Sequence, residues 1–299
     1  MLFRPRHLDH RGPARGAATR WARLPVLAGV LAIVMAGLPA VQANAVQAVR
    51  YVALGDSSAA GPLIPNQIDA VCLRSDHDWP HVLATRLGAE LTDVTCSGAT
   101  IPDLTGRQLG VVPPQFDALR PDTDLVTLAI GANDVKLYET FLACAKPAPA
   151  PPGPTCRQRF TTDGVDQFSV RIRDTAPKMA TALAEIHRRS PHARVIVTGY
   201  LTYWRPGGCY PADPFTPEDA NYIQATLDHL MLMLAYETFT HRATYVDIRG
   251  PSAWHGLCEP PERRWLEGLV PASPAYPYHP NATGMAHAAA IISHAVDVR

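Results

Sequence analysis

The sequence has few charged residues, and neither sign of charge is in excess. Charged residues make up 18% of the 299 residues, and 27 basic residues balance 27 acidic ones. The cysteines and histidines show neither a Cys-x-x-Cys pair nor a His-rich spacing, so we expect no metal site. Because 47% of the residues are hydrophobic, the chain can bury a full globular core and does not have the composition of a disordered protein.

The N-terminal segment differs from the rest of the chain. Six arginines precede an apolar run, Leu24 to Val41, and an Ala-x-Ala pattern follows at Ala43 to Ala45. This order predicts that residues 1–45 are an export signal that is removed on secretion. The alternative is an uncleaved membrane anchor, because the run is just long enough to span a bilayer if it is slightly extended. Pro25, Pro39 and the small residues after the run favour cleavage. The segment has no adjacent Arg-Arg pair, so the twin-arginine route is not indicated.

Residues 46–299 have no internal repeat, and we expect them to form a single domain. The first 45 residues hold six of the 27 basic residues and one of the 27 acidic ones, so their removal leaves a formal charge of −5. A mildly acidic protein has no electrostatic reason to bind nucleic acid. We therefore expect a protein that is secreted or held in the cell envelope and that meets a membrane only through its N-terminal segment or through transient lipid contact. The sequence makes no prediction of oligomeric state.

All six cysteines lie in the exported part of the chain. An even number of cysteines in an oxidising compartment predicts three disulfides, although fifteen pairings are possible. We expect pairing in chain order, partly because the middle pair would close the Pro-rich loop from Ala145 to Thr155. The expected disulfides are Cys72–Cys96, Cys144–Cys156 and Cys209–Cys258.

Strand-length apolar runs alternate with helical patterns along the chain. This alternation predicts a three-layer α/β/α domain with a central parallel sheet. In such sheets, functional residues collect on loops beyond the carboxyl ends of the strands. The predicted strands are residues 50–55, 90–96, 124–131, 193–200 and 243–248, and the predicted helices are 79–89, 165–190, 216–239 and 281–296.

Four polar loop segments either follow predicted strands or precede the last helix. They are GDSSAAG (Gly55 to Gly61), CSGAT (Cys96 to Thr100), GANDV (Gly131 to Val135) and YHPNATG (Tyr278 to Gly284). Each taken alone is ordinary loop chemistry. Together and in this order they resemble the four sequence blocks of the SGNH branch of the GDSL hydrolases, specifically its secreted bacterial esterases and lipases.

The resemblance implies the SGNH hydrolase fold, which is flavodoxin-like, and the hydrolysis of small-molecule or lipid esters without a cofactor. It implies Ser57 as nucleophile, His279 as general base, and Ser57, Gly98 and Asn133 as oxyanion-hole donors. These residue types suit those roles, because a serine hydroxyl needs a base near neutral pH and a tetrahedral intermediate needs preorganised donors. The G-x-S-x-G nucleophile elbow of the α/β-hydrolases is absent.

Each of these residues also has a purely structural interpretation. Ser57 is compatible with a helix cap, Gly98 with a turn, Asn133 with a bond inside its own loop, and His279 with a plain loop position. The neighbouring polar residues are expected to hold the loops in place. These are Asp56, Ser58 and Asp134.

The position three residues before His279 departs from the family pattern. Family members often have an aspartate there to orient the imidazole, but here the residue is Tyr276. We expect a Ser-His dyad in which the main-chain carbonyl of Tyr276 orients the ring, because the other ring nitrogen needs only an acceptor. Asp247 and Glu267 are remote alternatives for a third member.

Two classes of function are compatible with this pattern. One is a carboxylic ester hydrolase, which includes phospholipases and sugar-ester deacetylases, and the other is a catalytically silent cell-surface binding domain of the same fold. The missing aspartate is the only support for the second class. The loops Leu201–Phe215 and Pro251–Val270 are candidate walls of the acyl site, with packing of Trp204, Trp254 and Trp265 against the sheet edge as the alternative.

Overall fold

The central element of the fold is a five-stranded parallel sheet. The computed structural model describes residues 48–297, so the expected export segment lies outside the described residues. The strand order is β4-β1-β5-β8-β9, with every neighbouring pair parallel. The strands are β1 (Arg50–Gly55), β4 (Glu90–Asp93), β5 (Leu125–Ala129), β8 (Arg194–Thr198) and β9 (Thr244–Val246).

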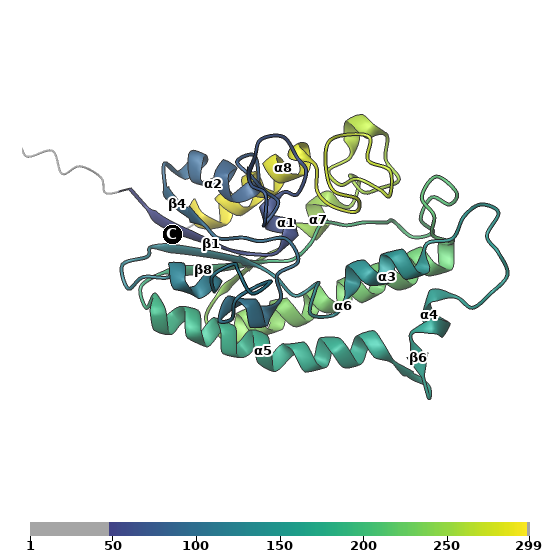
Figure 1. The fold of residues 1–299 in the computed structure, drawn as a ribbon, viewed down its shortest axis with the longest axis horizontal. Helices are drawn as coiled ribbons and strands as arrows, with labels where there is room; N and C mark the ends of the chain where they lie inside the picture. The colour runs from purple at the N-terminus through teal and green to yellow at the C-terminus, as the bar shows by residue number, and fades with distance from the viewer. Residues whose placement is uncertain (1–47, 298–299) are drawn as a thin grey trace, which may run out of the picture. The chain divides into compact units, whose positions relative to one another are not determined.

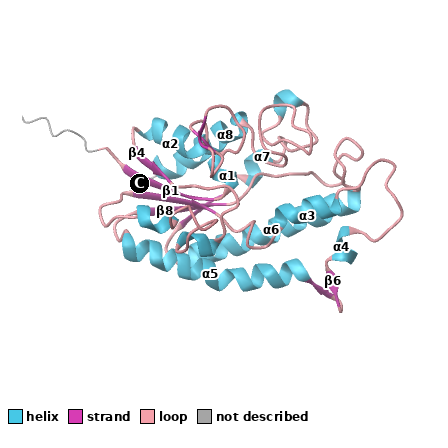
Figure 2. Cartoon of the chain, in the orientation of Figure 1, coloured by secondary structure: helices cyan, strands magenta, loops and turns pink. Residues whose placement is uncertain are grey.

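Helices cover both faces of this sheet, so the predicted three-layer α/β/α architecture is confirmed. Helices α2 (Trp79–Leu87) and α8 (Ala282–Asp297) pack together on one face (Figure 1). Helices α5 (Gln167–Arg189) and α6 (Pro217–Thr240) pack together on the other face (Figure 2).

The central strands form because they are apolar on both faces. All five residues of β5 are buried, as are five of the six residues of β1. A strand buried on both faces is typical of a parallel sheet covered by helices. Strand β1 lies between β4 and β5, so the loops that follow these three strands emerge next to one another at the carboxyl edge.

Side-chain caps fix where the long helices begin. The Thr216 side chain accepts from the Asp219 backbone N–H, as the sequence predicts for α6. Asp78 caps α2 by accepting from the His81 N–H. These bonds satisfy backbone N–H groups that have no intrahelical partner.

Several short elements lie in the connections, and the sequence pattern does not predict them. The connections hold two small antiparallel hairpins, four short helices and three 3-10 turns. They are β2 (Gln67–Asp69), β3 (Arg74–Ser75), β6 (Thr161–Thr162), β7 (Val165–Asp166), α1 (Ser57–Ala60), α3 (Leu137–Cys144), α4 (Cys156–Arg159), α7 (Arg249–Ser252), η1 (Ile101–Leu104), η2 (Gln115–Ala118) and η3 (Pro261–Arg263).

Three disulfides hold these connections. They are Cys72–Cys96, Cys144–Cys156 and Cys209–Cys258, the pairs expected from chain order. The second pair joins α3 to α4 and closes the Pro-rich loop between them. Among residues 48–297, no helix combines the length and the apolar character that a membrane crossing requires.

Gly55 ends β1 immediately before the Asp56–Ser57 turn, and its position leaves no room for a side chain. A Cβ atom there would lie 2.6 Å from the Ala129 carbonyl oxygen, and the residue has φ +154°.

We expect Gly55→Ala to lower the free energy of unfolding by about 2–3 kcal/mol through overpacking. Gly110→Ala is the control, since its φ is +73° but its Cβ would meet nothing within 4 Å, and it should cost about 1 kcal/mol. Urea denaturation measures both values, and an equal loss of unfolding free energy in the two variants would contradict the overpacking at Gly55.

Candidate active site

Ser57 begins the four-residue helix α1 directly after β1. Asp56 is the N-cap of this helix, and its Oδ1 accepts both the Ser58 N–H at 2.8 Å and the Ser58 hydroxyl at 2.7 Å. The expectation that Asp56 and Ser58 hold the turn is therefore confirmed. Because neither of them contacts the Ser57 hydroxyl, that group is left available for another partner.

That partner is His279, which lies 222 residues further along the chain. The Ser57 Oγ and the His279 Nε2 are 2.7 Å apart. The Nδ1 atom on the other side of the ring is 2.8 Å from the Pro277 carbonyl oxygen. A carbonyl can only accept, so Nδ1 carries the ring proton and Nε2 is free to accept from the serine hydroxyl.

The expectation that the Tyr276 carbonyl orients His279 is wrong by one residue. The Tyr276 carbonyl instead accepts the His279 backbone N–H at 3.0 Å, which closes a tight turn. Pro277 at the second position and φ +61° at Tyr278 in the third are the signature of a type II turn. In this turn the Pro277 carbonyl is the one that faces the imidazole, so a backbone acceptor is present but comes from Pro277.

Neither of the remote carboxylates contacts the imidazole. Asp247 accepts from the backbone N–H groups of Arg249 and Gly250. Glu267 is fully buried, and its carboxylate accepts from the Asn281 side-chain amide at 2.7 Å. Both alternatives for a third member are therefore wrong, and the Glu267 carboxylate reaches the turn through the Asn281 side chain.

Asn281 fixes the start of the last helix. Its Oδ1 accepts the Gly284 N–H at 2.9 Å and its amide donates to the Glu267 carboxylate, while the side chain is buried. The Asn281 side chain is therefore a helix cap next to the His279 turn. The Glu267 N–H also donates to the His279 carbonyl, so the turn is held from both sides.

One groove contains the Ser57 hydroxyl, the His279 ring and three further polar groups, which are the Ser57 N–H, the Gly98 N–H and the Asn133 amide. The groove is lined by Ser57, Gly98, Asn133 and His279. Among residues 48–297, neither the Ser57 N–H nor the Gly98 N–H donates a hydrogen bond. The Asn133 amide donates one hydrogen to the Ala99 carbonyl at 2.9 Å and has a second hydrogen to give. These donors can therefore serve a bound oxygen atom.

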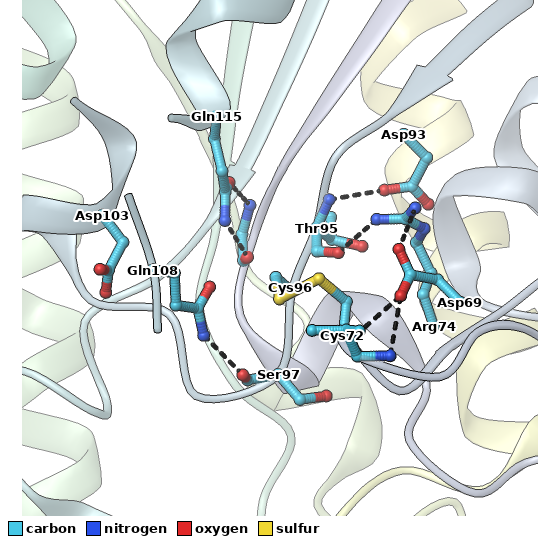
Figure 3. Close-up of a disulfide and its surroundings, with 12 residues drawn as sticks. Asp69, Cys72, Arg74, Asp93, Thr95, Cys96, Ser97, Asp103, Gln108 and Gln115 are labelled. Carbon is cyan, nitrogen blue, oxygen red and sulfur yellow. Dashed lines mark hydrogen bonds and ion pairs between the residues drawn. A yellow bond between two sulfur atoms is a disulfide. The ribbon is translucent and has the colours of Figure 1, made fainter. Parts of the chain in front are cut away.

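The loop that carries Gly98 is held by several contacts from outside. The disulfide Cys72–Cys96 ties its first residue to the hairpin before α2, as Figure 3 shows. The Gln108 amide donates to the Ser97 carbonyl at 2.8 Å, and φ at Gly98 is +81°. Glycine suits this conformation, and its N–H is unobstructed by a side chain.

Two residues that the sequence pattern does not single out, Tyr200 and Gln115, connect the loops. The Tyr200 hydroxyl donates to Asp56 at 2.8 Å and accepts the Ala132 N–H at 2.9 Å, so it links the serine turn to the loop of Asn133. The buried Gln115 amide bonds both the N–H and the carbonyl of Gly55 (Figure 3). Asp134 accepts the Ile101 N–H, in agreement with its expected loop-holding role.

Burial governs the ionisation of the site. Burial lowers the pKa of His279 to about 4, and the hydrogen bond to the Pro277 carbonyl opposes this shift only in part. Burial also raises the pKa of Asp56, against the hydrogen bonds from Ser58 and Tyr200. At neutral pH the imidazole is therefore uncharged, which is the form that can accept a proton.

The walls of the groove are apolar and aromatic. The groove encloses about 520 Å³, and its walls include Pro62, Leu73, Tyr138, Leu142 and Tyr276, with Glu139 among the lining residues. The Tyr276 ring stands perpendicular to the His279 ring, with 5.3 Å between their centroids.

The tryptophan side chains do not line this groove. Leu201 and Tyr203 of the first loop and Leu266 of the second line a second pocket that also contains Ser57 and His279, so the two loops contribute walls to the site while their tryptophans do not. Trp204 is buried against Phe141 and Phe215. Trp265 stacks between two histidine rings, and the exposed Trp254 lies under the Arg205 guanidinium. The buried Trp204 and Trp265 have packing roles. The groove walls come from the connections after β1 and β4, from α3 and from the loop before α8.

Comparison with known proteins agrees with this geometry. The profile of the GDSL-like lipase/acylhydrolase family matches residues 53–287. Lipase 2 of Streptomyces coelicolor is 38% identical over 270 residues, which cover 87% of this chain and 88% of the relative. A lipase from Streptomyces rimosus is 30% identical over 91% of this chain and 94% of its own length.

Two solved structures share the fold. The extracellular lipase of Streptomyces rimosus superposes with a TM-score of 0.69 at 25% identity, over 83% of this chain and all of its own. Phospholipase A1 of Streptomyces albidoflavus superposes with a TM-score of 0.67 at 23% identity, over 84% of this chain and all of its own. From its profile match and its similarity to these lipases, the chain belongs to the GDSL-like lipase/acylhydrolase family.

Proposed function

We propose that this protein is an exported lipase or esterase that cleaves carboxylic esters through an acyl-enzyme on Ser57. The observation that carries the proposal is the 2.7 Å contact between Ser57 Oγ and His279 Nε2, with Nδ1 bonded to a backbone carbonyl. This tautomer leaves Nε2 as an acceptor, which is the state that a general base requires.

The first half of the reaction forms the acyl-enzyme. His279 Nε2 takes the Ser57 hydroxyl proton while Oγ bonds to the ester carbonyl carbon, giving a tetrahedral intermediate. The imidazolium then gives that proton to the alcohol oxygen as the carbon–oxygen bond breaks, and the acyl group stays on Ser57. In the second half, His279 takes a proton from a water molecule, and the water oxygen bonds to the acyl carbon. The imidazolium then gives the proton to Ser57 Oγ as the acyl bond breaks, which releases the carboxylic acid and the free serine.

The developing oxyanion needs donors that are already in place. The Ser57 and Gly98 N–H groups and the second amide hydrogen of Asn133 line the same groove as the nucleophile. Donors preorganised in this way stabilise the charge without any reorganisation during the reaction. The contacts from Asp134, Tyr200 and the disulfide hold the three loops that supply them.

The Pro277 carbonyl replaces the carboxylate that orients histidine in a triad. It fixes the tautomer and the direction of the ring, but a neutral oxygen stabilises the imidazolium less than a carboxylate does. The low pKa of His279 agrees with this weaker stabilisation of the charged form. We infer a dyad whose base stays neutral well into the acid range.

The apolar lining of the groove favours a substrate whose acyl group is apolar. Its walls of Pro62, Leu73, Tyr138, Leu142 and Tyr276 offer apolar area and no positive charge. The named relatives are lipases, which agrees with lipid or simple esters as the substrate class.

Export is supported by two features of the chain and by one neighbour. The arginine-rich and apolar leader precedes a domain with three disulfides, which form and persist outside the cytosol. The structural neighbour from Streptomyces rimosus is an extracellular lipase. We propose that residues 46–299 are the exported form.

We expect Ser57→Ala and His279→Ala each to reduce kcat for a nitrophenyl ester by about 10⁴-fold or more, as for paired nucleophile and base residues. Ser58→Ala is the matched control, since it removes one hydrogen bond to Asp56 and should cost less than about tenfold. A fluorophosphonate probe should label the wild-type protein and the Ser58 variant but not the Ser57 variant. A folded wild-type protein that is neither labelled nor active on esters of any chain length would favour the binding-domain alternative.

Removal of the Asn133 amide should act on the transition state. We expect Asn133→Ala to lower kcat by about 10²–10³-fold with little change in KM, because the amide bonds the oxyanion more strongly than the ground-state carbonyl. Steady-state kinetics and a thermal melt of the same sample separate this effect from unfolding. A rise in KM at constant kcat would remove Asn133 from the oxyanion hole.

The low pKa of His279 predicts the acid limb of the pH profile. The imidazole accepts the serine proton only when it is neutral, so activity falls as pH drops through its pKa. We expect kcat/KM for a nitrophenyl ester to hold from pH 7 to about pH 5 and to fall tenfold per unit below about 4. Circular dichroism at each pH checks that the protein stays folded. A limb centred at or above the usual histidine pKa near 6.5 would contradict the proposed environment.

A further inference from the structure

A second cluster of titratable side chains lies outside the groove, where α2 begins and β4 ends. Asp78 caps α2, His81 is in the first turn of that helix, and Asp93 is the last residue of β4. One nitrogen of His81 and one oxygen from each carboxylate all lie within 4.8 Å of one another. The three residues come from two elements, so their spacing in the chain does not form a metal motif.

The distances within the cluster are close to those of ligands around one ion. His81 Nδ1 is 2.7 Å from Asp78 Oδ1 and 3.4 Å from Asp93 Oδ2. Ligand atoms in a tetrahedral zinc site are about 3.3–3.6 Å apart when the bonds to the metal are about 2.0–2.2 Å. Small side-chain rotations would therefore suffice to place an ion between them.

The carboxylates also have bonding capacity that the described part of the chain leaves unused. The Asp78 and Asp93 side chains are 0% and 4% exposed, and the Oδ2 atom of each has no hydrogen-bond partner among residues 48–297. Buried oxygens without partners are costly. The unused oxygen of Asp93 is one of the two that face His81.

The only cationic partner that the described residues offer these two carboxylates is the His81 imidazole. Within the described residues, no lysine or arginine forms an ion pair with Asp78 or Asp93. The nearby Arg74 donates to the Thr95 carbonyl and to Asp69 (Figure 3). A single imidazolium supplies at most one positive charge for two buried carboxylates, whereas a divalent cation supplies two.

We propose that Asp78, His81 and Asp93 bind a divalent transition-metal ion, with Zn²⁺ as the best fit. One imidazole nitrogen and two carboxylate oxygens suit Zn²⁺, while Ca²⁺ takes six to eight oxygen ligands. The His81 side chain is 28% exposed, which gives the ion an entry path and gives water a fourth position. This site departs from the expectation of no metal that the sequence pattern supports.

The ion would stabilise the protein and would take no part in the reaction. None of its three ligands lines the substrate groove. It would join the end of β4 to the start of α2, where the Trp79 indole N–H donates to the Ser58 carbonyl at 3.2 Å. The proposed site therefore stabilises the helix start that contacts the nucleophile turn through Trp79. Metal binding there does not depend on the proposed activity.

The test is equilibrium dialysis of the purified protein, without a polyhistidine tag, against Zn²⁺ after treatment with a chelator. We expect one tightly bound Zn²⁺ per chain and a rise in Tm of about 5 °C or more at a hundredfold excess over Kd. Ca²⁺ at the same concentration should produce no comparable shift.

Variants distinguish this cluster from other metal-binding groups. His81→Ala should abolish both the bound Zn²⁺ and the shift in Tm, and Asp93→Asn should weaken binding at least tenfold while its Oδ1 still accepts the Thr95 N–H. His77→Ala is the matched control, because His77 pairs with Asp76 at the surface. This variant should bind Zn²⁺ as tightly as the wild-type protein does. The absence of a bound Zn²⁺ in the wild-type protein, or equal binding in the folded His81 or Asp93 variant, would overturn the proposal.

Discussion

The site depends on one buried carboxylate, Asp56. It caps α1, accepts two hydrogen bonds from Ser58, and accepts the Tyr200 hydroxyl, which in turn receives the Ala132 N–H. These contacts bind the serine turn to the loop of Asn133, so the nucleophile and one donor move as a unit. Because Asp56 is 1% exposed, the bonds form in a low dielectric, where such a network is rigid when it is fully satisfied.

The histidine is positioned by backbone rather than by a charged partner. The type II turn around Pro277 places a carbonyl on Nδ1 and leaves Nε2 facing Ser57. A neutral acceptor costs some stabilisation of the imidazolium, but it also spares the site a second buried carboxylate. Glu267 provides its support one step away, through the Asn281 amide at the start of α8. The Glu267 carboxylate therefore contacts Asn281 at the start of α8 and does not contact the His279 ring.

The long elements could be read from the sequence because their patterns are local. The Arg50–Gly55 strand matches the prediction at both ends, and the Thr216 cap sets the start of α6. The short hairpins are not visible in the sequence, since strands of two or three residues are too short to show a period. Helix α3 is not predicted because it has only eight residues, although its buried residues have helical spacing. Tyr200 and Gln115 look like ordinary strand-end and loop residues until the fold brings them to Asp56 and Gly55. The error at Tyr276 has the same origin, because spacing from His279 does not reveal which carbonyl a turn directs inward.

A backbone carbonyl holds His279 as a neutral base that is hydrogen-bonded to Ser57. The most direct measurement is nitrogen NMR of the protein with labelled histidine, assigned by comparison with the His279→Ala variant. We predict that at pH 7 Nδ1 carries the proton and Nε2 is an unprotonated acceptor. A spectrum in which the His279 proton resides on Nε2, or in which both nitrogens are protonated at that pH, would contradict it.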